Sequence, residues 1–384
     1  MLVYIFVFIV VLFFCILYDY NLKNIGNKSR FFYFLCGLIS LVSGLRYHIG
    51  SDTANYMNYF IEVPTISNIL TSVDFDDLSQ PLWFLLNSIC KTVVDDFILV
   101  QLVHSFAVNL LVGRFIYKTC SKPFLALLAY LCCAWANFNF EIMRESLCIA
   151  IYLNLLYDCY IKNNNIRRFL LYSIPLMFIH HFAFIPLLLT FILYYIKYNR
   201  LLYFGLLLSI VLYLTLSEDM VIQFILLFGG VLDSETMSIA TDYIESDKYG
   251  MMNASLIGIA FAFLTKILYS FVVSKDKRID PLIAKLLLMY GLIAILRLKL
   301  FIITRFLNYW QIILIVYSIN YYILHKKQIL ALYVKLCFVY NIYLGIDSFL
   351  TPLDFDNSKY DCRYVPYSSY LDKTTNPIRE TYFY

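Results

Sequence analysis

The chain has 384 residues, of which 61% are hydrophobic and only 15% are charged, and its mean hydropathy is +0.73. A soluble globular domain carries roughly a quarter charged residues, so this composition excludes a soluble enzyme and indicates a membrane protein. The net charge of +4 is small, so the distribution of basic residues between loops is more informative than their total.

Apolar runs that approach the length of a membrane span recur along the whole chain. A spanning helix needs about 20 apolar residues, and roughly 17 is the lower limit. The runs are 2–18, 31–45, 97–117, 123–140, 146–160, 169–180, 182–196, 201–217, 251–273, 281–296, 306–324 and 329–349. The sequence therefore predicts an all-α polytopic membrane protein with about twelve transmembrane helices, which form a single domain over residues 1–349.

The stretch 169–196 has two interpretations. Basic residues stand at both of its ends, and His180 and His181 stand at its middle. Because basic ends favour the same side of the membrane, we expect two short helices that meet at the histidines. A single long tilted helix is the alternative.

Basic residues gather at every second boundary between the predicted spans. In chain order they are Lys23, Lys28 and Arg30; Lys118 and Lys122; Lys162, Arg167 and Arg168; Lys197 and Arg200; Lys275, Lys277 and Arg278; and Lys326 and Lys327. Short loops rich in Lys and Arg lie in the cytoplasm. Both termini, the long loops 46–96 and 218–250 and the tail 350–384 are then expected at the outer face. Apolar stretches within the two loops predict interfacial helices there, and a re-entrant segment is the alternative for "QPLWFLLNSICK" in the first loop.

Ionisable residues stand at the outer ends of several predicted spans. They are Arg46, His48 and Asp52 in "LRYHIGSDTANYMNYF", then Arg144 and Glu145, His180 and His181, and finally Arg297 and Arg305. Ionisable groups at membrane depth are costly and mark polar cavities with a function. Guanidinium groups match phosphate oxygens in two-point contacts, and histidine transfers protons near neutral pH. The pattern predicts a phosphate-binding site with acid–base groups at the outer face.

Simpler interpretations exist for individual residues. Arg46 with Asp52 suits an ordinary interfacial ion pair, Arg144 with Glu145 suits a pair at a helix start, and Arg297 suits a side chain that extends to lipid head groups. Motifs for nucleotide binding, metalloproteases and serine hydrolases are absent from the sequence. No Cys/His cluster has metal-ligand spacing, so we expect no metal, no cofactor and no nucleic-acid partner.

Six segments, in the same order, resemble the EpsG/Wzy-type polysaccharide polymerases that make O-antigen, capsule or exopolysaccharide. The family signature Arg-x3-Gly-x-Asp-x3-Tyr occurs as Arg46, Gly50, Asp52 and Tyr56. "QPLWFLLN" is similar to the next family segment, in which Gln80 replaces an acid that is common there. "FEIMRESLCIAIYL" is similar to the family's arginine-containing helix start, and "FIHHFAFIPLLL" aligns His180 with its characteristic histidine. "TRFLNYW" and the tail "YVPYSSYL" match more weakly.

The resemblance implies a GT-C-like helical fold and a glycosyltransferase activity. Such an enzyme transfers the growing glycan from its undecaprenyl-diphosphate carrier to an incoming lipid-linked repeat unit. It works at the outer, periplasmic face of the bacterial inner (plasma) membrane. The implied partners are the undecaprenyl-diphosphate-linked oligosaccharide, membrane lipids, a chain-length regulator and a flippase.

The resemblance also suggests roles for individual residues. Arg46, Arg144 and Arg305 would stabilise the charge on the leaving diphosphate. His180, Asp52 or Glu145 would deprotonate the acceptor hydroxyl. The other candidates are His48, His181, Arg297 and Tyr56. An O-antigen ligase-type glycosyltransferase would share these residues, whereas a lipid-linked oligosaccharide flippase would need charges through the depth of the membrane. A membrane acyltransferase would suit the histidine but not several outer arginines.

Overall fold

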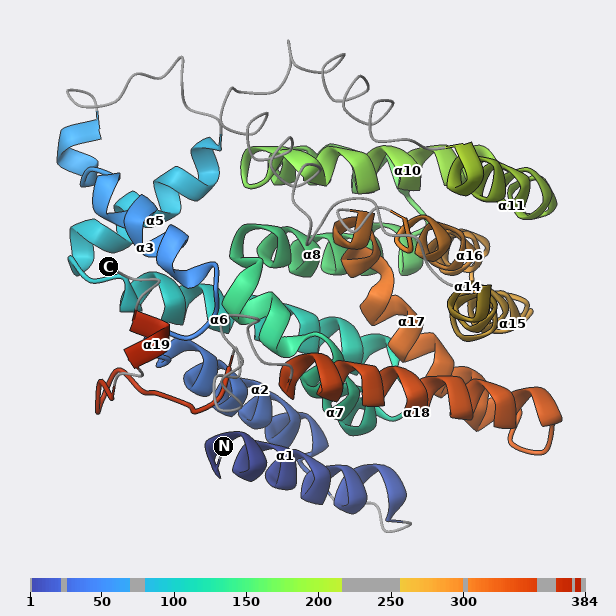
Figure 1. Ribbon diagram of the computed structural model, residues 1–384, viewed down its shortest axis with the longest axis horizontal. Helices are drawn as coiled ribbons and strands as arrows, with labels where there is room; N and C mark the ends of the chain where they lie inside the picture. The colour runs from blue at the N-terminus through green and yellow to red at the C-terminus, as the bar shows by residue number, and fades with distance from the viewer. Residues whose placement is uncertain are drawn as a thin grey trace. The chain divides into compact units, whose positions relative to one another are not determined.

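The chain folds into helices, and the computed structural model (Figure 1) describes them over residues 2–21, 26–69, 80–215, 256–299, 303–350, 364–374 and 377–380. It divides into two compact units, of which the first comprises Met1–Phe184 with Phe338–Tyr384 and the second comprises Ile185–Cys337. The predicted outer loop 218–250 and the first part of the predicted tail 350–384 lie outside the described residues.

The first unit is built around helix α6. Its helices are α1 (Leu2–Cys15), α2 (Lys28–Gly44), α3 (Thr53–Glu62), α5 (Pro81–Val93), α6 (Ile98–Thr119), α7 (Pro123–Cys133), α8 (Met143–Leu155), α9 (Ile166–Ser173) and α19 (Pro377–Glu380). Short π or 3-10 turns extend several of them: η1 (Ile16–Tyr20), η2 (Ile66–Asn68), η3 (Asn137–Glu141), η4 (Leu156–Ile161), η5 (Ile174–Phe178) and η6 (His181–Ala183). Helix α6 packs most extensively against α2 and α8, and it also contacts α5 and α7.

The second unit is built around helix α16. Its elements are α10 (Phe184–Tyr195), α11 (Tyr198–Thr215), α14 (Leu256–Ala262), η7 (Phe263–Leu268), α15 (Tyr269–Ser274), α16 (Pro281–Leu296), α17 (Thr304–Leu324) and the first part of α18 (Ile329–Leu350). Asp280 caps α16 by accepting a hydrogen bond from the Leu282 amide at 2.8 Å. Buried side chains surround α16, which contacts α11, α15 and α17. Most residues of α16 are themselves buried, including Lys285, whose Nζ donates to the Tyr194 and Ile196 carbonyl groups at 3.0 and 3.1 Å.

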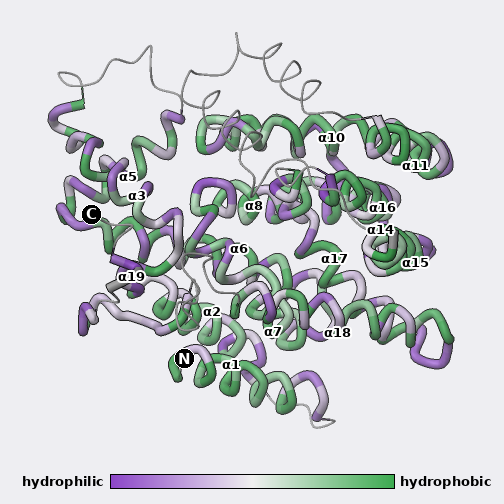
Figure 2. The backbone as a smooth tube through the Cα atoms, viewed as in Figure 1, coloured by the Kyte–Doolittle hydropathy of each residue, from purple (hydrophilic) through white to green (hydrophobic). Residues whose placement is uncertain are grey.

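Among the described residues, five helices are long and apolar enough to cross a membrane. They are Leu2–Tyr20, Ile98–Thr119, Tyr198–Thr215, Ile257–Ser274 and Ile329–Leu350. Figure 2 shows hydrophobic residues along most of α1, and its exposed side chains include Phe6, Ile9 and Phe13. These findings confirm a helical protein of the polytopic membrane class. The total of about twelve spans and the GT-C-like arrangement stay predictions.

The histidines at the middle of 169–196 interrupt the helical path. Helix α9 passes into the turn η5, and His180 then adopts an extended conformation with φ −153° and ψ 117° before η6 and α10 begin. The predicted pair of short helices is therefore confirmed, and the single long helix is wrong.

Helix α6 carries polar side chains on the face that packs inside the first unit. Gln101, His104, Ser105 and Asn109 are buried, and we call them the α6 polar face. Val103 and Leu110, on another side of the helix, are exposed. This arrangement is the reverse of a helix on a water-soluble protein. In hydrocarbon, polar groups must find their partners within the protein, which explains why they point inward.

The α6 polar face ties three helices together. The Asn109 amide donates to Asn139 Oδ1 at 3.0 Å, and the Tyr130 hydroxyl donates to Asn109 Oδ1 at 2.8 Å. The Ser40 hydroxyl of α2 donates to the Ser105 carbonyl at 3.2 Å. The polar contacts therefore fix α2, α7 and the turn η3 around α6.

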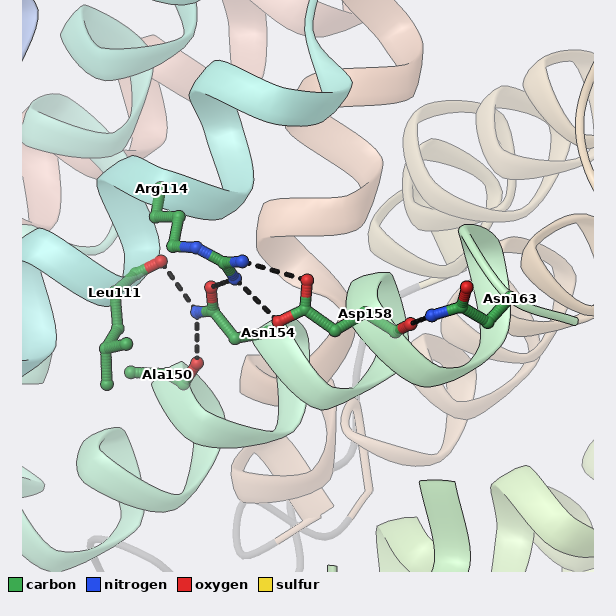
Figure 3. Close-up of polar contacts among 6 residues, drawn as sticks. All are labelled: Leu111, Arg114, Ala150, Asn154, Asp158 and Asn163. Carbon is green, nitrogen blue, oxygen red and sulfur yellow. Dashed lines mark hydrogen bonds and ion pairs between the residues drawn. The ribbon is translucent and has the colours of Figure 1, made fainter. Parts of the chain in front are cut away.

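A second set of polar contacts joins the last turns of α6 to the end of α8 (Figure 3). Arg114 donates to Asn154 Oδ1 at 2.6 Å and to the two carboxylate oxygens of Asp158 at 2.9 and 2.8 Å. The Asn154 amide in turn donates to the carbonyl groups of Leu111 and Ala150, both at 2.8 Å. Near the start of both helices, His104 Nε2 donates to the Met143 carbonyl at 2.9 Å. Helices α6 and α8 are thus held in register at two levels.

We expect Arg114→Gln and Asp158→Asn each to lower the midpoint temperature of unfolding in detergent. The two side chains form a two-point ion pair, which each substitution breaks. The double variant should be destabilised by less than the sum of the single effects, with a coupling of about 1 kcal/mol. Additive losses in this double-mutant cycle would show that the two residues stabilise the helices independently.

Candidate functional site

The segment between α2 and α3 contains most residues of the signature and needs unusual backbone angles. His48 has φ 49° and Gly50 has φ 97°, and glycine adopts such values at no steric cost. A Cβ at position 50 would also lie only 2.6 Å from the Phe140 carbonyl oxygen. Glycine therefore allows this segment to lie directly against the turn η3.

Glu141, the last residue of the turn η3, holds the start of α3 through hydrogen bonds. It is 2% exposed. Its carboxylate accepts hydrogen bonds from the Ser51 amide at 3.2 Å, the Ser51 hydroxyl at 2.7 Å and the Asp52 amide at 3.1 Å. A carboxylate at this position satisfies amides that the helix leaves free and interacts favourably with the helix dipole. The Thr53 hydroxyl adds a bond of 3.2 Å to the Phe140 carbonyl.

Sequence reasoning missed Glu141 as a site residue. It lies three positions before Arg144 in the same motif, and this proximity is the signal that could have identified it. Its partner Asp52 is half-buried. The structure therefore brings the first and third motifs into direct contact.

Arg46 is completely enclosed. Its Nη1 donates to the Ser43 carbonyl at 2.7 Å, and its Nη2 donates to Met143 Sδ at 3.4 Å. The guanidinium carbon lies 5.2 Å from the centre of the Phe140 ring, in cation–π geometry. These contacts therefore place a buried positive charge next to Met143, the first residue of α8.

The charge of Arg46 survives this burial. Desolvation lowers the pKa of its guanidinium to about 10, while the negative charge of Glu141 opposes the shift. The group therefore stays protonated at neutral pH. Among the described residues, Arg46 forms no ion pair with Asp52, so the simple interfacial pair considered from the sequence is not observed.

Arg144 lies at the point where three helices meet. It stands in the first turn of α8 and is half-buried. Its Nη1 donates to Gln80 Oε1 at 3.1 Å, directly before α5, and its guanidinium lies 5.6 Å from the centre of the Tyr56 ring of α3. No carboxylate among the described residues pairs with it. Because Gln80 is neutral, it orients the guanidinium without cancelling its charge.

The other acid–base candidates of the first unit lie on or against α8. Glu145 is buried in the first turn of this helix. His180 is buried and lies between η5 and η6, while His181 is half-buried and begins η6; both turns contact α8. Cys148 of α8 donates from Sγ to the Leu176 carbonyl of η5 at 3.4 Å. The histidine segment is therefore held on the helix that begins with Arg144 and Glu145.

The C-terminal tail covers the signature segment. The Tyr47 amide donates to the Ser368 carbonyl at 2.9 Å, and the Tyr370 amide donates to the Leu45 carbonyl at 2.7 Å. His48 stacks on Tyr47, and its Nδ1 lies 2.9 Å from each carboxylate oxygen of Glu380 in α19. These contacts bring the tail motif against the first motif, and they place His48 in a structural contact with the Glu380 carboxylate.

The two remaining candidates belong to the second unit. Arg305 is half-buried in the first turn of α17, and Arg297 is exposed directly after α16. Their roles stay predictions. Within the part of the chain that the structure describes, no group of three His, Cys, Asp or Glu side chains could hold a metal ion.

We expect Glu141→Ala to destabilise the protein by about 1–3 kcal/mol, because two partly buried amides lose their acceptor. Glu141→Gln keeps one acceptor oxygen and should cost less. Glu62, an exposed carboxylate at the other end of α3, supplies the control variant Glu62→Ala. The measurements are thermal unfolding in detergent and the rate of proteolysis in the segment 45–53. Equal stability of Glu141→Ala and Glu62→Ala would contradict the anchoring role.

Comparisons with known proteins agree with this assembly of motifs. Searches among curated proteins and among solved structures find no match. The EpsG family model matches residues 29–369, a range that contains the site motifs from Arg46 onward and the first six residues of the tail motif at 364–371. Because this match covers most of the chain, the protein belongs to the EpsG family.

Proposed function

We propose that the protein is a polysaccharide polymerase that joins lipid-linked oligosaccharide repeat units. Membership of the EpsG family supports a polymerase-like role in a multi-pass membrane protein. The observation that carries the proposal is Arg144, whose guanidinium is oriented by Gln80 and Tyr56 but is not neutralised by a carboxylate among the described residues. Such a group suits a phosphate ligand.

The donor would be the growing glycan on undecaprenyl diphosphate, and Arg144 would bind its diphosphate. Arg46 would add a second positive charge. It is buried next to the start of α8, where the low polarity of the surroundings strengthens electrostatic interactions. Arg305 stays a candidate for the same role from the sequence alone. Stabilisation of the departing diphosphate is the main contribution required of the protein, because negative charge develops there in the transition state.

The acceptor would be the sugar hydroxyl of an incoming lipid-linked unit. Its oxygen attacks the anomeric carbon of the donor, the bond from that carbon to the diphosphate oxygen breaks, and the hydroxyl proton passes to a base. His180 suits this role because imidazole exchanges protons near neutral pH. Asp52 and Glu145 are the alternative bases, and His181 is a further candidate.

The proposed setting is the outer face of a bacterial inner membrane. The alternation of basic loops along the sequence supports this orientation. A flippase that delivers the lipid-linked unit and a regulator of chain length are the partners that such a polymerase requires. An O-antigen ligase-type enzyme would use the same groups but a different acceptor.

We expect Arg144→Ala to reduce polymerisation at least a hundredfold, because one oriented charge at a developing anion is commonly worth this factor or more. Single repeat units should accumulate on the lipid carrier. Arg144→Lys should recover part of the activity. Arg167→Ala, which removes an exposed arginine just inside α9, should behave like the wild type.

The measurement is the ladder of glycan lengths from cells that carry each variant in place of the native chain. Normal ladders from both Arg144→Ala and His180→Ala would refute the assignment of the site. Long polymer that remains on its carrier in cells without the protein would instead indicate a ligase.

A further inference from the structure

Helix α5 packs one side, which includes Trp83 and Asn87, against the protein and exposes apolar residues on another side. Leu82, Leu85, Ile89 and Val93 are between 38% and 70% exposed, and we call them the α5 stripe. Their spacing of three or four residues places them along one side of the helix. No charged residue interrupts this side, so it would be unfavourable in water.

The polar residues of α5 are used to hold the neighbouring helix α3. The Ser88 hydroxyl donates to the Pro64 carbonyl at 2.7 Å. Lys91 Nζ donates to the Phe60 and Ile61 carbonyl groups at 3.0 and 2.8 Å, which are orphan acceptors at the end of α3. Asn87 donates to the Trp83 carbonyl within α5 at 2.8 Å. These hydrogen bonds are made by residues outside the stripe, so the stripe itself presents only apolar side chains and suits an apolar environment.

The length of α5 indicates where that environment lies. The helix has 13 residues, which corresponds to about 20 Å and is shorter than the roughly 30 Å hydrocarbon core. It contacts α6, which is long and apolar enough to span. Helix α5 is thus too short to cross the membrane and is attached to a helix that does.

A cation stands at one end of the α5 stripe. Gln80 precedes the first residue of the helix and accepts the hydrogen bond from Arg144 at 3.1 Å. The stripe begins two residues later at Leu82. The surface therefore offers a positive charge followed directly by an apolar track. A polyprenyl diphosphate has the matching order, because its charged head is joined directly to a long isoprenoid chain.

We propose that the α5 stripe binds the isoprenoid chain of the lipid-linked donor and delivers its diphosphate to Arg144. This proposal rests on the proposed function, and it adds the route by which the donor reaches the site. Ordinary phospholipid acyl chains are the competing occupant, and the experiments below separate the two.

The first experiment compares two donors that carry the same repeat unit on undecaprenyl diphosphate or on geranyl diphosphate. Leu85→Asn and Ile89→Asn should raise KM for the undecaprenyl donor about tenfold, because each removes apolar contact with the chain. The KM for the geranyl donor should change little, and kcat should be retained for both donors. The control is Leu336→Asn, on α18, where the native leucine is 60% exposed.

The outcomes of this comparison are distinct. An equal rise in KM for both donors would overturn the proposal, since it would indicate a defect in folding or in the site. An equal effect of Leu336→Asn would also overturn it, since any lipid-facing substitution would then suffice. If the wild-type protein turns over neither donor, the proposed function itself fails.

The second experiment tests occupancy without turnover. A photoreactive benzoylphenylalanine replaces Leu85 or, as the control, Leu336, and the protein is reconstituted in phosphatidylglycerol vesicles that contain a small fraction of undecaprenyl diphosphate. An adduct with undecaprenyl diphosphate should form at position 85 and not at position 336. Adducts only with phosphatidylglycerol at position 85 would overturn the route even if the polymerase activity is confirmed.

Discussion

The need to satisfy polar groups inside a membrane determines the architecture around the candidate site. The α6 polar face turns inward because hydrocarbon offers it no partners. Its hydrogen bonds hold α2, α7 and η3 in place, while His104 fixes the start of α8. The signature segment that follows α2 and the arginine motif that begins α8 are thereby fixed relative to each other. Helices whose polar sides must find their partners inside the protein thus bring the residues of the candidate site together.

The two arginines of the first unit differ in the way their charge is used. Arg46 is enclosed between Ser43, Met143 and Phe140, so it contributes a fixed positive charge and holds the segment together. Arg144 is only half-buried and has a neutral amide as its partner. A glutamate in place of Gln80 would pair with it and reduce its affinity for an anion. The amide therefore orients Arg144 while leaving its charge available for a ligand.

In the proposed route, helix α5 would connect this site to the lipid. Its polar side stabilises the end of α3 through Ser88 and Lys91, and its N-terminal end positions Gln80 against Arg144. The α5 stripe, on another side of the helix, is apolar and exposed. A soluble enzyme would place such a surface in its core, whereas an enzyme that acts on a membrane-anchored substrate can use it to bind the anchor. This short helix stabilises the end of α3 and positions Gln80, and in the proposed route it would also bind the lipid anchor of the substrate.

The sequence by itself determined the helical membrane class, the interruption at His180, the grouping of ionisable residues at span ends and the family. These features are local, because hydrophobic runs and motif spacings are patterns among residues that lie close together in the sequence. The tertiary structure alone revealed Glu141 as the anchor of Ser51 and Asp52, Gln80 as the partner of Arg144, and Glu380 beside His48. Each of these contacts joins residues more than 60 positions apart. No local pattern encodes such contacts, because they exist only once the helices have packed.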